Sequence, residues 1–115
     1  VRIVLLSVSQ RPVVVVGRGA HVFLPRDWGL AVRLVAPHVD RVARVEREQG
    51  LGHRAAERWV TSTDHDREAF VRRHFHQDPG DLTAFDLVVN TQTLGVEGAA
   101  EVIVGAARTR GPALE

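Results

Sequence analysis

Three short apolar runs, each close to turn-forming residues, limit this chain to a small number of folds. They are the β-branched run Val13–Val16, closed by Gly17, and the segments Ala31–Ala36 and Phe85–Val89. The first run is unbroken, and the second is interrupted only by Arg33; short, mainly apolar runs of this kind are typical of strands buried on both faces of a parallel sheet. Helical patterns separate the second run from the third and follow the third. We therefore expect an α/β fold, with a parallel sheet of about three strands flanked by helices.

The helical stretches have recognisable ends. Helices are expected over Val39–Gln49, closed by Gly50, then over a long and bent stretch His53–His76, and finally from Val96 to about Thr109. The inward face of the first of these is predicted to carry Val39, Val42, Ala43 and Val45. Residues 1–12 are expected to end a preceding helix and turn, and residues 110–115 to form a tail. Residues 1–115 then make a single domain.

Composition excludes several functional classes. A chain of 115 residues with 44% hydrophobic and 25% charged residues has the make-up of one small globular domain. Its net charge is +1, with the two signs interspersed, which argues against a nucleic-acid partner or an anionic membrane surface. The absence of cysteine excludes disulfides and thiolate chemistry. Because there is neither an apolar run of membrane-spanning length nor a signal-peptide pattern, we expect a cytoplasmic protein.

A glycine-rich turn follows the first predicted strand. Gly17, Arg18 and Gly19 would lie at the carboxyl edge of the sheet, where open α/β folds bind ligands. The glycines let backbone N–H groups approach an anion, and the guanidinium of Arg18 can donate two hydrogen bonds to a phosphate. The alternative is a tight turn with a solvated arginine. The third glycine of a dinucleotide-binding motif is absent.

Arginines also mark the two middle helices. Arg41, Arg44 and Arg47 form an outer stripe on the first, which is equally the pattern of a solvated amphipathic helix. On the second, Arg67 falls in the middle of an otherwise apolar face and Asp64 on its edge. The residues of that face are Trp59, Val60, Thr63, Phe70, Val71, His74 and Phe75. A buried guanidinium needs a partner, so either Asp64 neutralises Arg67 or the face borders a polar cleft. Arg72 and Arg73 point elsewhere.

Two further groups of polar residues lie near the predicted strands and helices. Asn90 and Thr91 follow the third predicted strand, where they are equally explained as a turn into the last helix. The histidines His65, His74 and His76 lie near several aspartates, but their spacing matches no strong zinc pattern. No metal site is predicted, and the role of these histidines stays open.

Four phrases of the sequence together resemble one enzyme family. In order they are VVVVGRGAH, VRLVAPHVDRVARVERE, TDHDREAFVRRHF and FDLVVNTQTLGVEGA. They are similar to the C-terminal half of the cytidylate kinase-like family, within the P-loop nucleoside-monophosphate kinase superfamily. The resemblance implies a partial P-loop kinase fold with a helical lid region over residues 38–76. It also implies phosphorylation of a nucleoside monophosphate, such as CMP, by ATP with Mg²⁺.

The resemblance also implies roles for individual residues. Gly17, Arg18 and Gly19 would hold the phosphate of the acceptor nucleotide. Contacts with ATP are implied for Arg41 and Arg44 in the lid and for Asn90, Thr91 and Gly95 near the adenine. The catalytic positions match Arg67 and Arg72.

The phosphate-binding loop of such kinases is missing from this sequence. There is no G-x-x-x-x-G-K-[ST], and all fifteen basic residues are arginine. We therefore expect the chain alone to be inactive, with ATP and Mg²⁺ held mainly by a missing N-terminal half. We also expect self-association through unpaired strand edges. A truncated kinase and a natural half-kinase both fit. Two other readings stay open: a non-catalytic nucleotide-binding or interaction module, and a small-molecule kinase with another acceptor.

Overall fold

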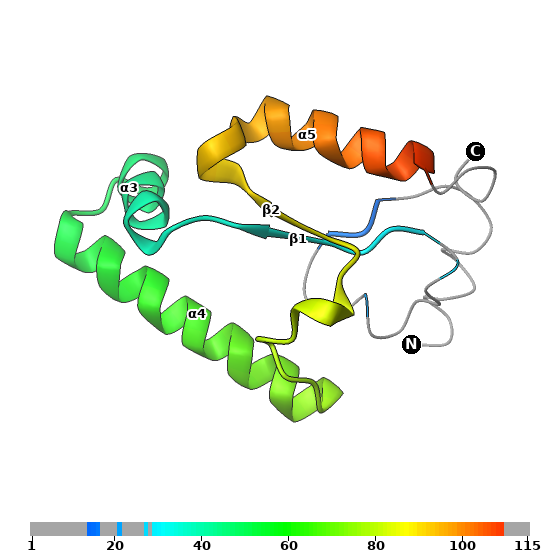
Figure 1. Cartoon of the computed structure of the whole chain (residues 1–115). Helices are drawn as coiled ribbons and strands as arrows, with labels where there is room; N and C mark the ends of the chain where they lie inside the picture. The colour runs from blue at the N-terminus through cyan, green and yellow to red at the C-terminus, as the bar shows by residue number, and fades with distance from the viewer. Residues whose placement is uncertain (1–13, 17–20, 22–26, 28, 110–115) are drawn as a thin grey trace.

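The computed structural model describes residues 14–16, 21, 27 and 29–109. Its elements, in order, are β1 (Val32–Val35), α3 (His38–Gln49), α4 (His53–Phe75), the 3₁₀ turn η2 (Leu82–Ala84), β2 (Leu87–Asn90) and α5 (Thr91–Thr109). This is an α/β arrangement around a parallel sheet (Figure 1). No helix in the described ranges is both long and apolar enough to cross a membrane.

The sheet consists of β1 and β2 in parallel, with Val32 opposite Leu87 and Val35 opposite Asn90. The backbone around Ala31 and Asp86 closes its entry side: the Ala31 N–H donates to Asp86 Oδ2 at 2.7 Å, and the Asp86 N–H donates to the Ala31 carbonyl at 2.8 Å. Helix α5 packs on both strands, and Val89 and Ala99 are buried. This is the core of the sheet region.

The first predicted strand is not formed in the described residues. Val14–Val16 have no regular secondary structure, and Val14 and Val16 are about nine-tenths exposed, at 90% and 91%. A β-branched run becomes a strand only where a neighbour takes its backbone hydrogen bonds, and β1 is paired with β2 alone in the described residues. The described sheet therefore has two strands where about three were expected.

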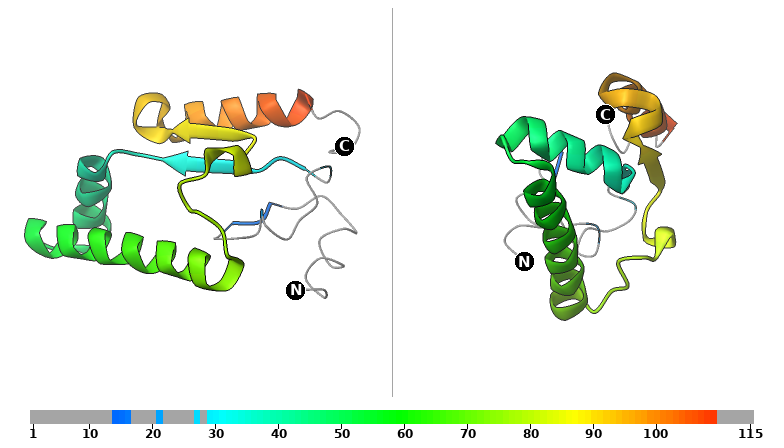
Figure 2. Two further views of the ribbon diagram at one scale, coloured as in Figure 1. Left: turned by 60° about the horizontal axis from the view of Figure 1, so that its bottom comes forward. Right: turned by 90° about the vertical axis from the view of Figure 1, so that its left-hand side faces the viewer.

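Helices α3 and α4 form a second layer, the α3–α4 arm. They pack on each other through the buried residues Val42, Val45, Ala56 and Val60, with Leu51 at the margin. Gly50 ends α3 with φ 64°, a left-handed conformation that favours glycine. In Figures 1 and 2 the α3–α4 arm and α5 lie on different sides of the sheet.

The bounds of α3 and α4 agree with the prediction to within about a residue, whereas α5 begins at Thr91, five residues before the predicted Val96. The stretch α4 is continuous over 23 residues, and His76 (φ 53°) closes it with its N–H donating to the Arg72 carbonyl at 3.2 Å. The turn η2 is capped by the preceding residue Asp81, whose carboxylate accepts from the Thr83 hydroxyl and N–H, and these bonds lower the pKa of Asp81. Within α5, Gly95 has φ 70° and ψ 175°, so regular helix resumes at the predicted Val96.

The predicted inward face of α3 is wrong at one position. Val39 is 77% exposed, whereas Val42 is 3% exposed. The buried face is centred between Val42 and Val45, and Val39 lies about 90° round the helix from that centre. The pattern of valines fixed the helix but not its rotation about its own axis.

The two valines provide a matched test of the arm core. We expect Val42→Ala to lower the free energy of unfolding by about 2 kcal/mol, through lost burial and the cavity left behind. Val39→Ala, on the same helix, should change it by less than about 0.5 kcal/mol. Urea denaturation followed by circular dichroism measures both. Equal losses would place Val39 in the core and contradict the orientation of α3.

Candidate functional site

The carboxyl ends of β1 and β2 lie side by side and form the edge of the sheet to which α3 and α5 are attached. Val35 and Asn90 are opposite each other there. The Thr91 hydroxyl donates to the Val35 carbonyl at 3.3 Å, and Asn90 Oδ1 accepts from the Gln92 N–H at 3.0 Å. Ligands of open α/β folds bind at this edge. Asn90 and Thr91 therefore occupy a suitable place, and their contact with adenine stays a prediction.

Arg41 joins this edge to both helices of the α3–α4 arm. Its Nε donates to the Ala36 carbonyl at 3.1 Å, just after β1. Its Nη1 donates to both carboxylate oxygens of Asp64 on α4, at 2.8 and 2.7 Å. The two side chains are 38% and 32% exposed, so solvent screens the pair only in part. Nη2 has no partner among the described residues, which leaves donors for an anionic ligand.

Asp64 does not neutralise Arg67, which was one of the two explanations that the sequence offered. Both oxygens of Asp64 accept from Arg41, and Arg67 is exposed with no ion pair in the described part of the chain. Helical periodicity places Arg67 on the side of α4 that carries Val60, Asp64 and Val71. An exposed cation on that side is available to a ligand.

The structure does not bring all of the predicted arginines together. Arg72 is exposed and lies about 140° round α4 from Arg67. Arg44 extends along α3, where its Nε donates to Glu48 Oε1 at 2.8 Å. This hydrogen bond, followed by the charge of Glu48, raises the pKa of Arg44. Arg44 is therefore engaged with the far end of α3 rather than with the carboxyl edge.

The predicted acceptor-phosphate residues Gly17, Arg18 and Gly19 lie outside the described residues. Across the ranges that are described, no three His, Cys, Asp or Glu side chains come close enough to hold a metal ion. The ring of His74 instead lies 4.5 Å from that of Phe70, and Phe75 contacts the same phenylalanine edge-on.

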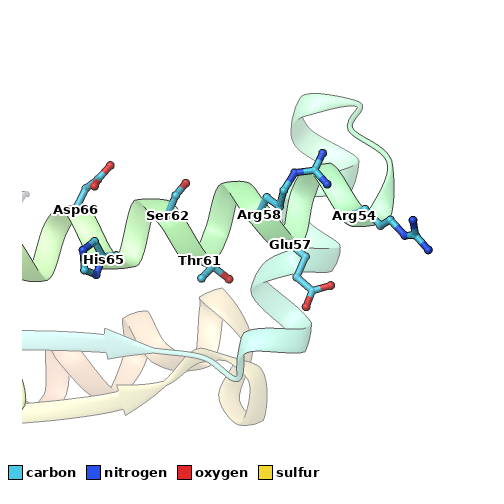
Figure 3. A pocket seen from close by; sticks show the side chains of 7 residues that line it. All are labelled: Arg54, Glu57, Arg58, Thr61, Ser62, His65 and Asp66. Atoms are coloured by element: carbon cyan, nitrogen blue, oxygen red, sulfur yellow. The ribbon is translucent and has the colours of Figure 1, made fainter.

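A hollow of about 670 Å³ lies along α4 (Figure 3). Its lining residues are Arg54, Glu57, Arg58, Thr61, Ser62, His65 and Asp66. All belong to one helix, whereas a ligand pocket encloses most of the ligand surface. Two arginines there are balanced by two carboxylates, and none of the predicted site residues is included. We therefore place the candidate site at the carboxyl edge and the inner side of α4.

Comparison with known proteins identifies the family. The model of the cytidylate kinase-like family matches residues 2–93, most of the chain. The chain belongs to the cytidylate kinase-like family. Among curated relatives, a cytidylate kinase of Aeropyrum pernix is 32% identical over 107 residues, which are 92% of this chain and 62% of that enzyme. A cytidylate kinase of Ignicoccus hospitalis is 33% identical over 72 residues, or 63% of this chain and 42% of that enzyme.

A third curated relative of this chain is not named as a kinase. A uronate isomerase of Corynebacterium glutamicum is 31% identical over 103 residues, which cover 90% of this chain but 20% of that protein. The match leaves four-fifths of the isomerase uncovered, so we infer no site in this chain from the name of that protein. The chain spans less than two thirds of all three relatives.

Sequence reasoning missed two contacts of the site. One is the bond between Asp64 and Arg41, because a partner three residues away was more obvious than one 23 residues away. The other involves Arg33, whose Nη1 donates to the Pro79 carbonyl at 2.6 Å. A signal for the second existed: Arg33 is the one charged residue in the apolar segment Ala31–Ala36, and a guanidinium in a strand needs an acceptor.

The Arg41–Asp64 pair should contribute measurably to stability. Asp64→Asn removes the charge but keeps the shape, and we expect it to lower the free energy of unfolding by about 1 kcal/mol, as for a half-exposed pair with hydrogen bonds. Asp66→Asn, an exposed aspartate on the same helix, is the matched control and should have little effect. Thermal or urea denaturation at neutral pH compares the two. Equal effects would mean that the contact with Arg41 adds nothing.

Proposed function

We propose that this chain is the C-terminal portion of an ATP-dependent nucleoside-monophosphate kinase, with CMP as the first acceptor to test. The observation that carries the proposal is the family match over residues 2–93, together with two relatives named cytidylate kinase. Because the chain covers 42% and 62% of those enzymes, the activity is proposed for a longer protein.

Phosphoryl transfer suits the chemistry that this chain offers. The transferred group carries negative charge on three oxygens, and catalysis consists largely of holding it and neutralising that charge. Arg67 is the proposed catalytic cation, supported by its exposed place on the inner side of α4 and by its freedom from Asp64. Arg72 is a second proposed catalytic cation with weaker support, since it lies on another side of the helix.

The nucleotide contacts are proposed for the carboxyl edge. Asn90, Thr91 and Gly95 would border the adenine of ATP, and the free donors of Arg41 would reach its phosphates. This is supported by the bond from Arg41 to the Ala36 carbonyl, which keeps the guanidinium beside that edge. Arg44 is proposed with less support, because it is paired with Glu48. Gly17, Arg18 and Gly19 are proposed to hold the acceptor phosphate.

We assign no ligand of Mg²⁺ among the described residues. In those ranges no three His, Cys, Asp or Glu side chains gather as a metal site, and Mg²⁺ in such reactions is held by one or two carboxylates together with the phosphates. The chain also lacks a lysine for the β- and γ-phosphates. We therefore derive no step through Mg²⁺ and propose that a preceding segment holds it with the triphosphate.

Purified residues 1–115 should show no ATP-dependent phosphorylation of CMP, UMP or AMP, because this sequence lacks the loop that cradles the β- and γ-phosphates. A coupled ADP-release assay measures this, with the complete protein assayed in parallel. Activity of residues 1–115 alone would overturn the proposal that a preceding segment holds Mg²⁺ and the triphosphate. If the complete protein phosphorylates only a different small molecule, or nothing, the other-acceptor or the non-catalytic reading replaces the proposal.

A cytoplasmic location and a single domain stay predictions.

In the complete protein, Arg67→Ala should lower kcat by about 10³-fold, since one well-placed cation contributes on that order to phosphoryl transfer. The melting temperature should hardly change, because Arg67 is exposed and unpaired in the described part of the chain. Arg58→Ala, about 180° round the same helix, is the control and should keep kcat near its original value. Near-normal turnover of Arg67→Ala would remove the catalytic assignment.

A further inference from the structure

Within the described residues, the chain connects the α3–α4 arm to the sheet region at two places. Its helices pack on each other, and neither packs to a comparable extent on the sheet or on α5. One connection is Ala36–Pro37, between β1 and α3. The other is the segment from His76 to Asp81, between α4 and η2 (Figure 1). The orientation of the arm therefore depends on what holds these two connections.

The first connection is held from within the arm. Arg41, on α3, bonds to the Ala36 carbonyl and to Asp64. Pro37 adds stiffness because its ring fixes φ. This connection is only two residues long, so it leaves α3 little freedom of position but does not fix the far end of α4.

The second connection is longer and contains turn formers. His76 is left-handed, and the Asp78 carboxylate accepts from the Gly80 N–H at 2.9 Å. These bonds are local and shape the turn without fixing it to the sheet. Arg33 supplies the long-range contact: from β1 its Nη1 reaches the Pro79 carbonyl, 46 residues along the chain, at 2.6 Å. Its guanidinium also lies over the Phe85 ring, 5.8 Å from the centroid.

We propose that Arg33 is a positioning residue that fixes the orientation of the α3–α4 arm relative to the sheet. Arg33 lies in β1, the strand from which the first connection leads to the arm, and its side chain bonds to the second connection at Pro79. Both ends of the arm are therefore attached to β1. The arm core of Val42, Val45, Ala56 and Val60 does not involve Arg33. Loss of Arg33 should therefore free the arm to reorient while its helices stay packed.

The effect on turnover rests on the proposed function, because Arg67 is carried by the arm while Asn90 and Thr91 belong to the sheet region. A cation that acts only in the transition state loses its effect when its placement varies, so kcat and kcat/KM should fall together. Arg41 is on the arm but is held beside the carboxyl edge by its bond to the Ala36 carbonyl, so KM for ATP should change much less than kcat. Substitution of a residue that binds ATP directly would instead raise KM for ATP.

The orientation can be measured without relying on activity. The chain has no cysteine, so Ser62→Cys on α4 and Glu101→Cys on α5, both exposed, accept spin labels at these two places alone. Double electron–electron resonance on the full chain gives the distribution of distances between the labels. We expect Arg33→Ala and Arg33→Gln, which is too short to reach Pro79, to broaden it at least twofold. Arg33→Lys keeps a donor and should restore part of the width, and Arg47→Ala, an exposed arginine on the arm, should leave it unchanged.

Each outcome decides the matter. A distribution that stays narrow in Arg33→Ala and Arg33→Gln overturns the proposal. So does loss of the folded helices in both variants, seen by circular dichroism, since Arg33 would then be required for folding rather than for position. In the complete protein, kcat should fall about 10-fold in Arg33→Ala with partial recovery in Arg33→Lys. If that protein proves to have no kinase activity, the proposed function fails while the distance measurement still tests Arg33.

Discussion

The guanidinium of Arg41 connects three segments of the chain: the exit of β1 at Ala36, the first turns of α3 and, 23 residues further on, the middle of α4 at Asp64. This contact adds to the covalent connection from the sheet to α3 through Ala36 and Pro37. The pair is half-exposed, so its Coulomb energy is modest. The pair matters mainly because it fixes the geometry of the guanidinium, since a guanidinium that bonds to both a carbonyl and a carboxylate can adopt few positions. The carboxyl edge of the sheet and the α3–α4 arm consequently share one anchor.

The two parts of the molecule are held together by different forces. Within the arm, apolar side chains of α3 and α4 exclude water from each other, and this contact is independent of the sheet. Between arm and sheet the hydrogen bonds from Arg41 to the Ala36 carbonyl and from Arg33 to the Pro79 carbonyl are exchangeable with water at little cost in free energy. The proposed catalytic cation is on the arm, and the proposed adenine contacts are in the sheet region.

Only some of the candidate residues of this member of the cytidylate kinase-like family lie where a kinase site would need them. Exposed arginines on α4 and polar residues at the carboxyl edge match the requirements of phosphoryl transfer. The sequence resemblance supplied Arg41, Arg67, Asn90 and Thr91 as candidates, and the described geometry places them in three different surroundings. Arg41 is already bonded on two sides, Arg67 is exposed, and the other two lie where parallel strands end. The sequence could not distinguish these situations, since each depends on a partner from another element.

What the sequence determined by itself was local. The ends of α3 and α4, the break at Gly95 and the two strands β1 and β2 follow from periodicity, glycine and proline, which act over a few residues. Only the tertiary structure decided that Val39 faces solvent, that Val14–Val16 form no strand among the described residues, and that Asp64 bonds to Arg41 rather than to Arg67. These depend on the rotation of a helix about its axis and on neighbours far along the chain. A one-dimensional pattern specifies which residues share a face, but the packing of other elements decides what that face meets.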